Sequence, residues 1–112
     1  MIAVDVNVVA YLLIEGEHTA VAEGLVATDP EWAAPLLWRS EWRNVLAGYL
    51  CRGTMDRAAA EAAVRGAERI LHGREYLPDG ARVLELVERS DCSAYACEYV
   101  AVAETLGVRL AT

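Results

Sequence analysis

Apolar positions recur along the whole chain and switch between β-prone runs and segments with helical spacing. Residues 1–4 form a short β-prone run that ends at Asp5, and residues 8–14 follow with helix-compatible spacing up to a breaker at Gly16. Thr19 is a favourable N-cap for another helix, which closes shortly before a proline. This part of the chain is therefore predicted to form a strand, a turn and two helices.

The next segment is predicted to be a loop that leads into a long helix. The loop contains Trp32, and Pro35 suits the first turn of a helix over residues 36–50 that stops at Gly53. Glu41 lies on or beside the apolar stripe of this helix, where a charged side chain is unfavourable without a partner. The position of this glutamate therefore calls for an explanation beyond solvation.

The second half of the chain predicts further helices between short strands. The helix that begins at Ser93 has Ala96 and Tyr99 among its inward-facing positions. The expected elements are a helix over 55–71 capped by Thr54, a short strand over 75–78, a helix over 81–90, a helix from Ser93 to a stop at Gly107, and a strand over 108–112.

Strands that alternate with helices predict an α/β fold, with a central parallel sheet flanked by helices on both faces. The 112 residues, of which 55% are hydrophobic, suit one domain over residues 1–112 and exclude a disordered chain. In an open parallel sheet, ligands bind outside the carboxyl ends of the strands, where Asp5 is expected. A structural role for Asp5 as the cap of the following helix remains open.

Charge and cysteine content narrow the classes of function. The net charge of -7 disfavours a protein that holds nucleic acid through a broad basic surface, although it is compatible with a nuclease whose metal ions offset its carboxylates. Cys51, Cys92 and Cys97 lack the spacing of a zinc site or a disulfide framework, so they are expected to be reduced. No apolar stretch is long enough to cross a bilayer, which predicts a cytoplasmic protein without a membrane partner.

Three segments resemble, in order, the motifs of PIN-domain toxins of the VapC type, a family of small metal-dependent ribonucleases. They are residues 3–12 (AVDVNVVAYL), 35–46 (PLLWRSEWRNVL) and 92–103 (CSAYACEYVAVA), and residues 107–112 (GVRLAT) resemble the strand that follows. In the family, the first segment delivers an aspartate that matches Asp5, and the second a glutamate that matches Glu41. The resemblance covers essentially the whole chain.

The resemblance implies a three-layer PIN-like domain with endoribonuclease activity that depends on Mg2+ or Mn2+. Asp5 and Glu41 would be catalytic residues and metal ligands, since these cations prefer hard oxygen ligands. A bound cation activates water and neutralises the charge of the scissile phosphate. The family also implies a homodimer and an antitoxin protein as the inhibitor, within a VapBC-type toxin–antitoxin system.

Two departures from the family pattern concern its acidic quartet. The third motif reads Tyr-Asp where this chain has Tyr95-Ala96, and the fourth acid normally follows shortly after the threonine that matches Thr112. The chain is therefore expected to be truncated at its C-terminal end relative to the family and impaired in catalysis. Deliberate inactivation, natural degeneration and an early end remain open as origins. If Ser93 is the N-cap, position 96 is one where a carboxylate would gain from the helix dipole.

Several polar residues accompany these positions. Asn7, Asn44 and Ser93 are candidates for supporting the metal ligands or contacting phosphate, although Asn7 and Ser93 have an alternative as helix caps. Asp91 is the better candidate to replace the missing acid, because Glu98 lies about 200° around the helix from Ala96 and should point away.

The remaining histidines and tryptophans are expected to have structural roles. His18 and His72 lie in predicted loops without a matched partner, which indicates solvated surface residues. Trp32, Trp38 and Trp42 are expected to serve packing or an interface rather than RNA stacking.

Two alternatives to a ribonuclease remain. A catalytically degenerate PIN module that binds a protein partner is favoured by Ala96. A phosphotransfer or receiver-like domain that uses Asp5 is weaker, because the lysine and the second adjacent aspartate of such a site are missing.

Overall fold

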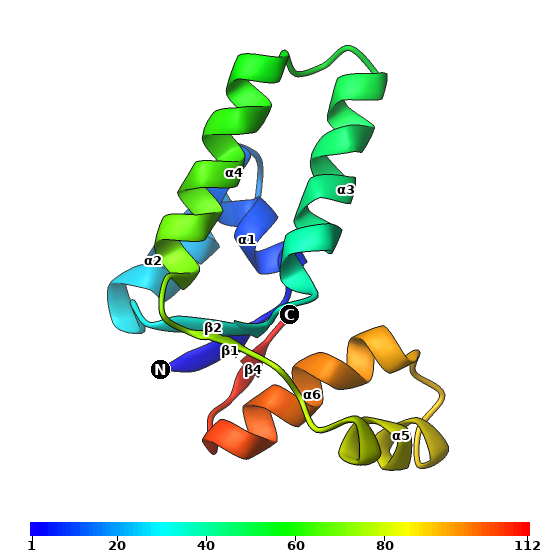
Figure 1. Ribbon diagram of the computed structural model, residues 1–112. Coiled ribbons are helices and arrows are strands. Elements are labelled where there is room, and N and C mark those ends of the chain that lie inside the picture. Colours follow the sequence, from blue (N-terminus) through cyan, green and yellow to red (C-terminus); the bar gives the residue numbers. More distant parts are fainter.

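The computed structural model describes residues 1–112 as a four-stranded parallel sheet with six helices (Figure 1). The strand order is β3-β2-β1-β4, so the chain reverses its direction of travel across the sheet when it reaches β4. The strands are β1 (Ile2–Val4), β2 (Trp32–Pro35), β3 (Glu75–Tyr76) and β4 (Leu110–Ala111). The α/β prediction with a parallel sheet is confirmed.

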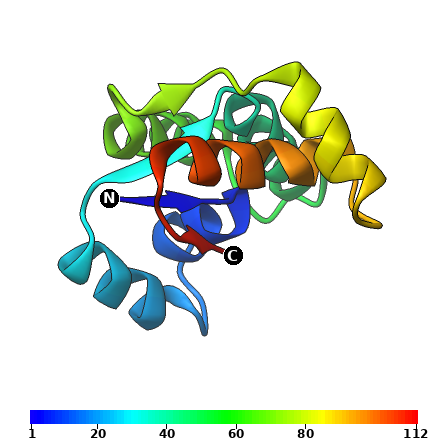
Figure 2. The same cartoon turned by 90° about the horizontal axis from the view of Figure 1, so that it is seen from below.

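The helices lie on both faces of the sheet and complete a three-layer arrangement (Figures 1 and 2). Helices α1, α3 and α4 cover one face and α6 covers the other, while α2 packs beside α1 and α5 beside α6. Their bounds are α1 (Val6–Leu13), α2 (Thr19–Thr28), α3 (Trp38–Cys51), α4 (Arg57–Leu71), α5 (Gly80–Glu88) and α6 (Ala94–Leu106). The two central strands, β1 and β2, therefore have no face exposed to solvent.

The main core lies between β1, β2 and the helices of the first layer, and large aromatic side chains fill it. Trp32, Trp38 and Trp42 are each at most 1% exposed. The Trp42 indole donates a hydrogen bond to the carbonyl of Ala63 at 3.1 Å, which satisfies the polar end of this buried ring. The expected packing role of the three tryptophans is confirmed. A smaller cluster around Val83 joins α5 to α6.

The prediction of a loop around Trp32 and Pro35 is wrong, because these residues form β2. This strand is fully buried, so it lacks the alternation of apolar and polar residues that marks a half-exposed strand. Pro35 ends the strand instead of opening the helix, and α3 begins at Trp38. A four-residue buried strand that ends in proline carries little local signal.

The helix caps agree with the sequence only in part. Ser93 accepts a hydrogen bond from the backbone N–H of Ala96 at 3.1 Å, so the predicted cap of α6 is confirmed. The predicted cap of α4 is wrong, because Asp56 performs this role instead of Thr54. The Thr19 hydroxyl also fails to cap α2 and accepts from the backbone of the preceding turn.

Candidate active site

Asp5 lies directly after β1, at the point where the strand order switches between β1 and β4. Its backbone N–H donates to the carbonyl of Ala111 at 3.1 Å, and its Oδ1 accepts from the N–H groups of Asn7 at 2.9 Å and Val8 at 3.2 Å. Asp5 therefore does cap α1, as the structural interpretation predicts. It also occupies the crevice position of open α/β sheets, so the two interpretations hold together.

Partial burial of Asp5 changes its acidity. Burial raises the pKa of this carboxyl, and the hydrogen bonds from Val8 and Asn7 oppose that rise without cancelling it. A nearby cation or hydrogen-bond donor would therefore stabilise its charged form.

Glu41 projects from α3 and has a specific partner on α6. The Tyr99 hydroxyl donates to Glu41 Oε1 at 2.5 Å, which joins residues 58 positions apart in the chain. Tyr99 is only 4% exposed, so this contact lies at the edge of the core. The partner that the half-buried Glu41 requires is thus a tyrosine, which the sequence places on the inner face of its helix without indicating this contact.

The Tyr99 hydroxyl is surrounded by negative charge. Its pKa is raised far above the usual range, first by burial, then by the hydrogen bond to Glu41 and by the charges of Glu41, Asp5 and Glu98. Tyr99 therefore remains a protonated donor under all ordinary conditions. Glu41 contacts this phenol directly, whereas Asp5 acts on it only through its charge.

Glu98 lines a different groove from Glu41, together with Val83 and Leu84 of α5, and it is not part of the lining beside Glu41. Burial raises the pKa of Glu98, and repulsion from the charge of Glu41 adds to this effect. Glu98 therefore does not replace the missing acid in the groove, although its charge and that of Glu41 influence each other.

An ion-pair network fixes the first turn of α3 and thereby the direction of Glu41. Arg39 donates to both carboxylate oxygens of Glu75 on β3, at 2.6 and 2.9 Å, and to Glu68 on α4 at 3.3 Å. The Trp38 indole donates to the same Glu75 at 2.6 Å. Bidentate arginine–carboxylate pairs restrict geometry more strongly than single contacts do, so α3 is held against the sheet edge.

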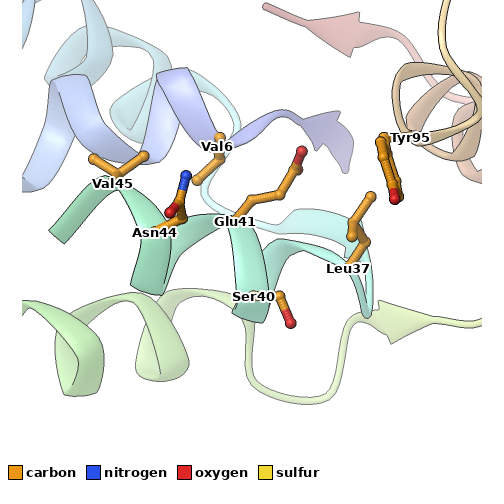
Figure 3. Close-up of a pocket in the computed structure, with 7 residues that line it drawn as sticks. All are labelled: Val6, Leu37, Ser40, Glu41, Asn44, Val45 and Tyr95. Carbon is orange, nitrogen blue, oxygen red and sulfur yellow. The ribbon is translucent and has the colours of Figure 1, made fainter. Parts of the chain in front are cut away.

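A groove of about 400 Å³ is lined by aliphatic and aromatic side chains, uncharged polar groups and a single charged residue, Glu41. In Figure 3 the Glu41 side chain extends from α3 into the space between Val6 and Tyr95. No arginine lines this groove, and the chain contains no lysine. The lining residues are Val6, Leu37, Ser40, Glu41, Asn44, Val45 and Tyr95.

The other predicted site residues are only partly brought together. Asn44 lines the groove beside Glu41, whereas Asn7 is exposed and contacts Asp5 through its backbone N–H. Ser93 acts as the helix cap described above. Asp91 is exposed in the connection between α5 and α6 and joins no acidic cluster. Ala96 is exposed rather than inward-facing, so a larger side chain has room there.

The carboxylate oxygens of Asp5 and Glu41 are the type of ligand that a hard cation prefers, but two carboxylates are fewer than a closed metal site needs. No three side chains of His, Cys, Asp or Glu converge in a way that holds a metal ion. Each of the two carboxylates keeps one oxygen that accepts no hydrogen bond from the protein. Mg2+ is commonly bound through one or two carboxylates while it keeps several waters. The pair therefore suits a weakly held, water-rich cation.

The predicted surface positions of both histidines are confirmed, whereas only one of the cysteines has the buried position that a structural role would suggest. His18 and His72 are exposed, and His18 pairs with the neighbouring Glu17 at 3.4 Å and packs against Tyr11. All three cysteines are free, and only Cys97 is buried. None of the helices is both long and apolar enough to span a membrane.

No protein-family model and no curated protein matches this chain. A functional argument therefore starts from the arrangement around Asp5, Glu41 and Tyr99.

Proposed function

We propose that this protein is a metal-dependent endoribonuclease toxin of the VapC type with a PIN domain, weakened by the alanine at position 96. One observation carries the proposal. Glu41 on α3 accepts a hydrogen bond from the buried Tyr99 hydroxyl beside an open groove, and Asp5 follows β1 at the same carboxyl edge of the sheet, where its charge also raises the pKa of Tyr99. Two carboxylates at that edge suit phosphodiester hydrolysis.

The side chains have distinct roles in this proposal. Asp5 and Glu41 would hold Mg2+ or Mn2+, which activates water and neutralises phosphate charge when bound. Tyr99 orients Glu41 through its hydrogen bond, and two backbone N–H groups orient Asp5. Asn44 lines the groove at the same level of α3 and would contact substrate.

The charge of the chain is consistent with RNA binding that depends on the cation. With a net charge of -7 and no cationic side chain in the groove, the protein itself offers little attraction to phosphate. A homodimer and an inhibitory antitoxin belong to the proposal through the family resemblance, and the proposal places the protein in the cytoplasm. They are tested separately from catalysis.

A second candidate function is a non-catalytic PIN module that binds a protein partner. The specific observation in its favour is that Asp5 and Glu41 have no third acid beside them that would complete a metal cluster. It predicts that an added acid at position 96 creates no activity.

The decisive experiment introduces the acid. Ala96→Asp adds a carboxylate at an exposed position of the first turn of α6. Ala94→Asp is a matched control, because it adds the same charge to the same helical turn at another exposed position about 200° around the axis. Both variants gain similarly from the helix dipole, so a difference between them reports on the site.

We expect Ala96→Asp to bind Mn2+ about tenfold more tightly or better, as metal sites respond on this scale to changes even in outer ligands. Calorimetry measures this affinity, and cleavage of a labelled single-stranded RNA measures activity. Cleavage by Ala96→Asp should require Mg2+ and vanish when Glu41→Gln is added. If Ala96→Asp performs no better than Ala94→Asp in both assays, the nuclease proposal is abandoned in favour of the binding module.

A further inference from the structure

Tyr95 is a large aromatic side chain without a partner at the groove beside Glu41. It is the second residue of α6, its ring is 62% exposed, and its hydroxyl makes no hydrogen bond within the protein. By contrast, the exposed Tyr11 packs against the ring of His18, with 4.6 Å between their centroids. The exposure of Tyr95 therefore leaves an aromatic face free at the candidate active site.

Asn44 offers uncharged hydrogen-bonding groups to the groove beside Glu41 (Figure 3). Ser40 lies one turn earlier on α3, where its hydroxyl points to the other side of the helix and accepts from Arg43 at 3.4 Å. The Asn44 amide carries both donors and an acceptor. Leu37 and Val45 contribute aliphatic surface beside these groups. Such a wall complements the edge of a flat, uncharged ring.

The charge of the groove distinguishes between parts of a nucleotide. Glu41 is the only charged residue in the lining, and it is negative. Glu41 would repel a phosphate group here unless a cation lay between them. A base, by contrast, carries exocyclic amines and ring N–H groups, which can donate hydrogen bonds to a carboxylate or amide oxygen. The lining therefore favours the base over the backbone.

We infer that Tyr95 and the groove beside Glu41 form a binding site for one unpaired base of single-stranded RNA. The base stacks on the Tyr95 ring, and its edge meets Asn44. This inference rests on the proposed function, because a base held beside Glu41 positions the adjoining phosphate at the two carboxylates. It adds the residues that hold the base, since stacking on one aromatic ring requires a base that is not already stacked in a duplex.

The test measures binding of two labelled probes by fluorescence anisotropy in low salt with Mg2+. One probe is a short single-stranded RNA, and the other is a strand of the same length without bases. The variants are Tyr95→Ala, Tyr95→Phe and the control Tyr11→Ala, which removes an exposed tyrosine outside the groove. Because Tyr95 is mostly exposed, its replacement should leave the fold intact, which circular dichroism verifies.

We expect Tyr95→Ala to weaken binding of the RNA about 5- to 150-fold, the range that loss of a base–aromatic stack produces. Tyr95→Phe keeps the ring and should stay within about twofold of the unaltered chain, as should Tyr11→Ala. Binding of the base-free strand should be weaker throughout and indifferent to Tyr95.

The remaining outcomes separate this inference from the proposed function. If Tyr95→Ala binds RNA as the unaltered chain does, or if both probes bind equally well, the base site is overturned, while cleavage by Ala96→Asp would still support the nuclease. If neither the unaltered chain nor Ala96→Asp binds RNA, the base site and the proposed function both fail.

Discussion

Removing the hydroxyl of Tyr99 tests the contact on which the site geometry depends. Tyr99→Phe keeps the buried ring and opens no cavity, so it deletes only the donor to Glu41. Hydrogen bonds to charged groups contribute about 1.5–3 kcal/mol, and water can replace part of this contact because Glu41 is only half-buried. We therefore expect a loss near the lower end, about 1.5 kcal/mol in the free energy of unfolding.

Urea denaturation of the variants measures this loss in the free energy of unfolding. Tyr95→Phe is the matched control, because it removes a phenolic hydroxyl on the same helix that has no partner, and it should cost less than about 0.5 kcal/mol. A double-mutant cycle with Glu41→Ala should return a coupling energy of at least about 0.5 kcal/mol. Since contacting residues are non-additive, this coupling assigns the loss to the pair.

The pH dependence of the free energy of unfolding provides an independent test. The pKa of Tyr99 is raised in the folded state, so its stabilising contribution is complete below the unfolded value of about 10 and is lost as the pH rises through the folded value. The gap between the unaltered chain and Tyr99→Phe should therefore shrink above pH 10. A gap that stays constant there, or a Tyr99→Phe variant as stable as Tyr95→Phe, refutes the reasoning.

Two further substitutions test the supports around the site. Glu75→Gln should cost about 1 kcal/mol at neutral pH, a value reduced for the 42% exposure of Arg39. Because Arg39 holds the pKa of Glu75 below its usual value of 4.5, this cost should fade as the pH drops below that value, and equal urea midpoint shifts at pH 7 and pH 3 would contradict it. Gly107→Ala should destabilise by about 1–2 kcal/mol because Gly107 ends α6 with a φ of 66°, whereas Gly24→Ala within α2 should be neutral or stabilising. If the melting temperatures of both glycine variants shifted in the same direction, the role of Gly107 as a left-handed cap would be contradicted.

The candidate site was predictable where it follows from position along the chain. Asp5 follows a short β-prone run, and Glu41 lies beside an apolar helical stripe, so both stand out from local patterns. Their convergence at the carboxyl edge of the sheet follows from parallel topology once strands and helices alternate. The need of Glu41 for a partner was also visible, since a half-buried charge requires one.

The identity of that partner was not predictable, because Tyr99 meets Glu41 across 58 residues. The only sign in the sequence was the phenol of Tyr99 on an otherwise apolar helical face, which indicates that its hydroxyl needs a hydrogen-bond partner. Periodicity does not indicate which acidic residue that partner is. The exposure of Tyr95 at the groove has the same origin. Both depend on how far α6 is rotated against the sheet, which the packing of Cys97 and Val83 helps to set.

The sequence by itself determined most of the helices and strands, the cap at Ser93 and the positions of Asp5 after its strand and Glu41 beside its helical stripe, because caps and periodicity act within a few residues. Only the tertiary structure decided that the stretch from Trp32 to Pro35 is a strand, since burial on both faces by distant helices removes the alternation that would identify it. It also decided which side chains surround the Tyr99 hydroxyl. The physical reason is that burial and charge–charge distance arise from packing between segments, and no local pattern encodes them.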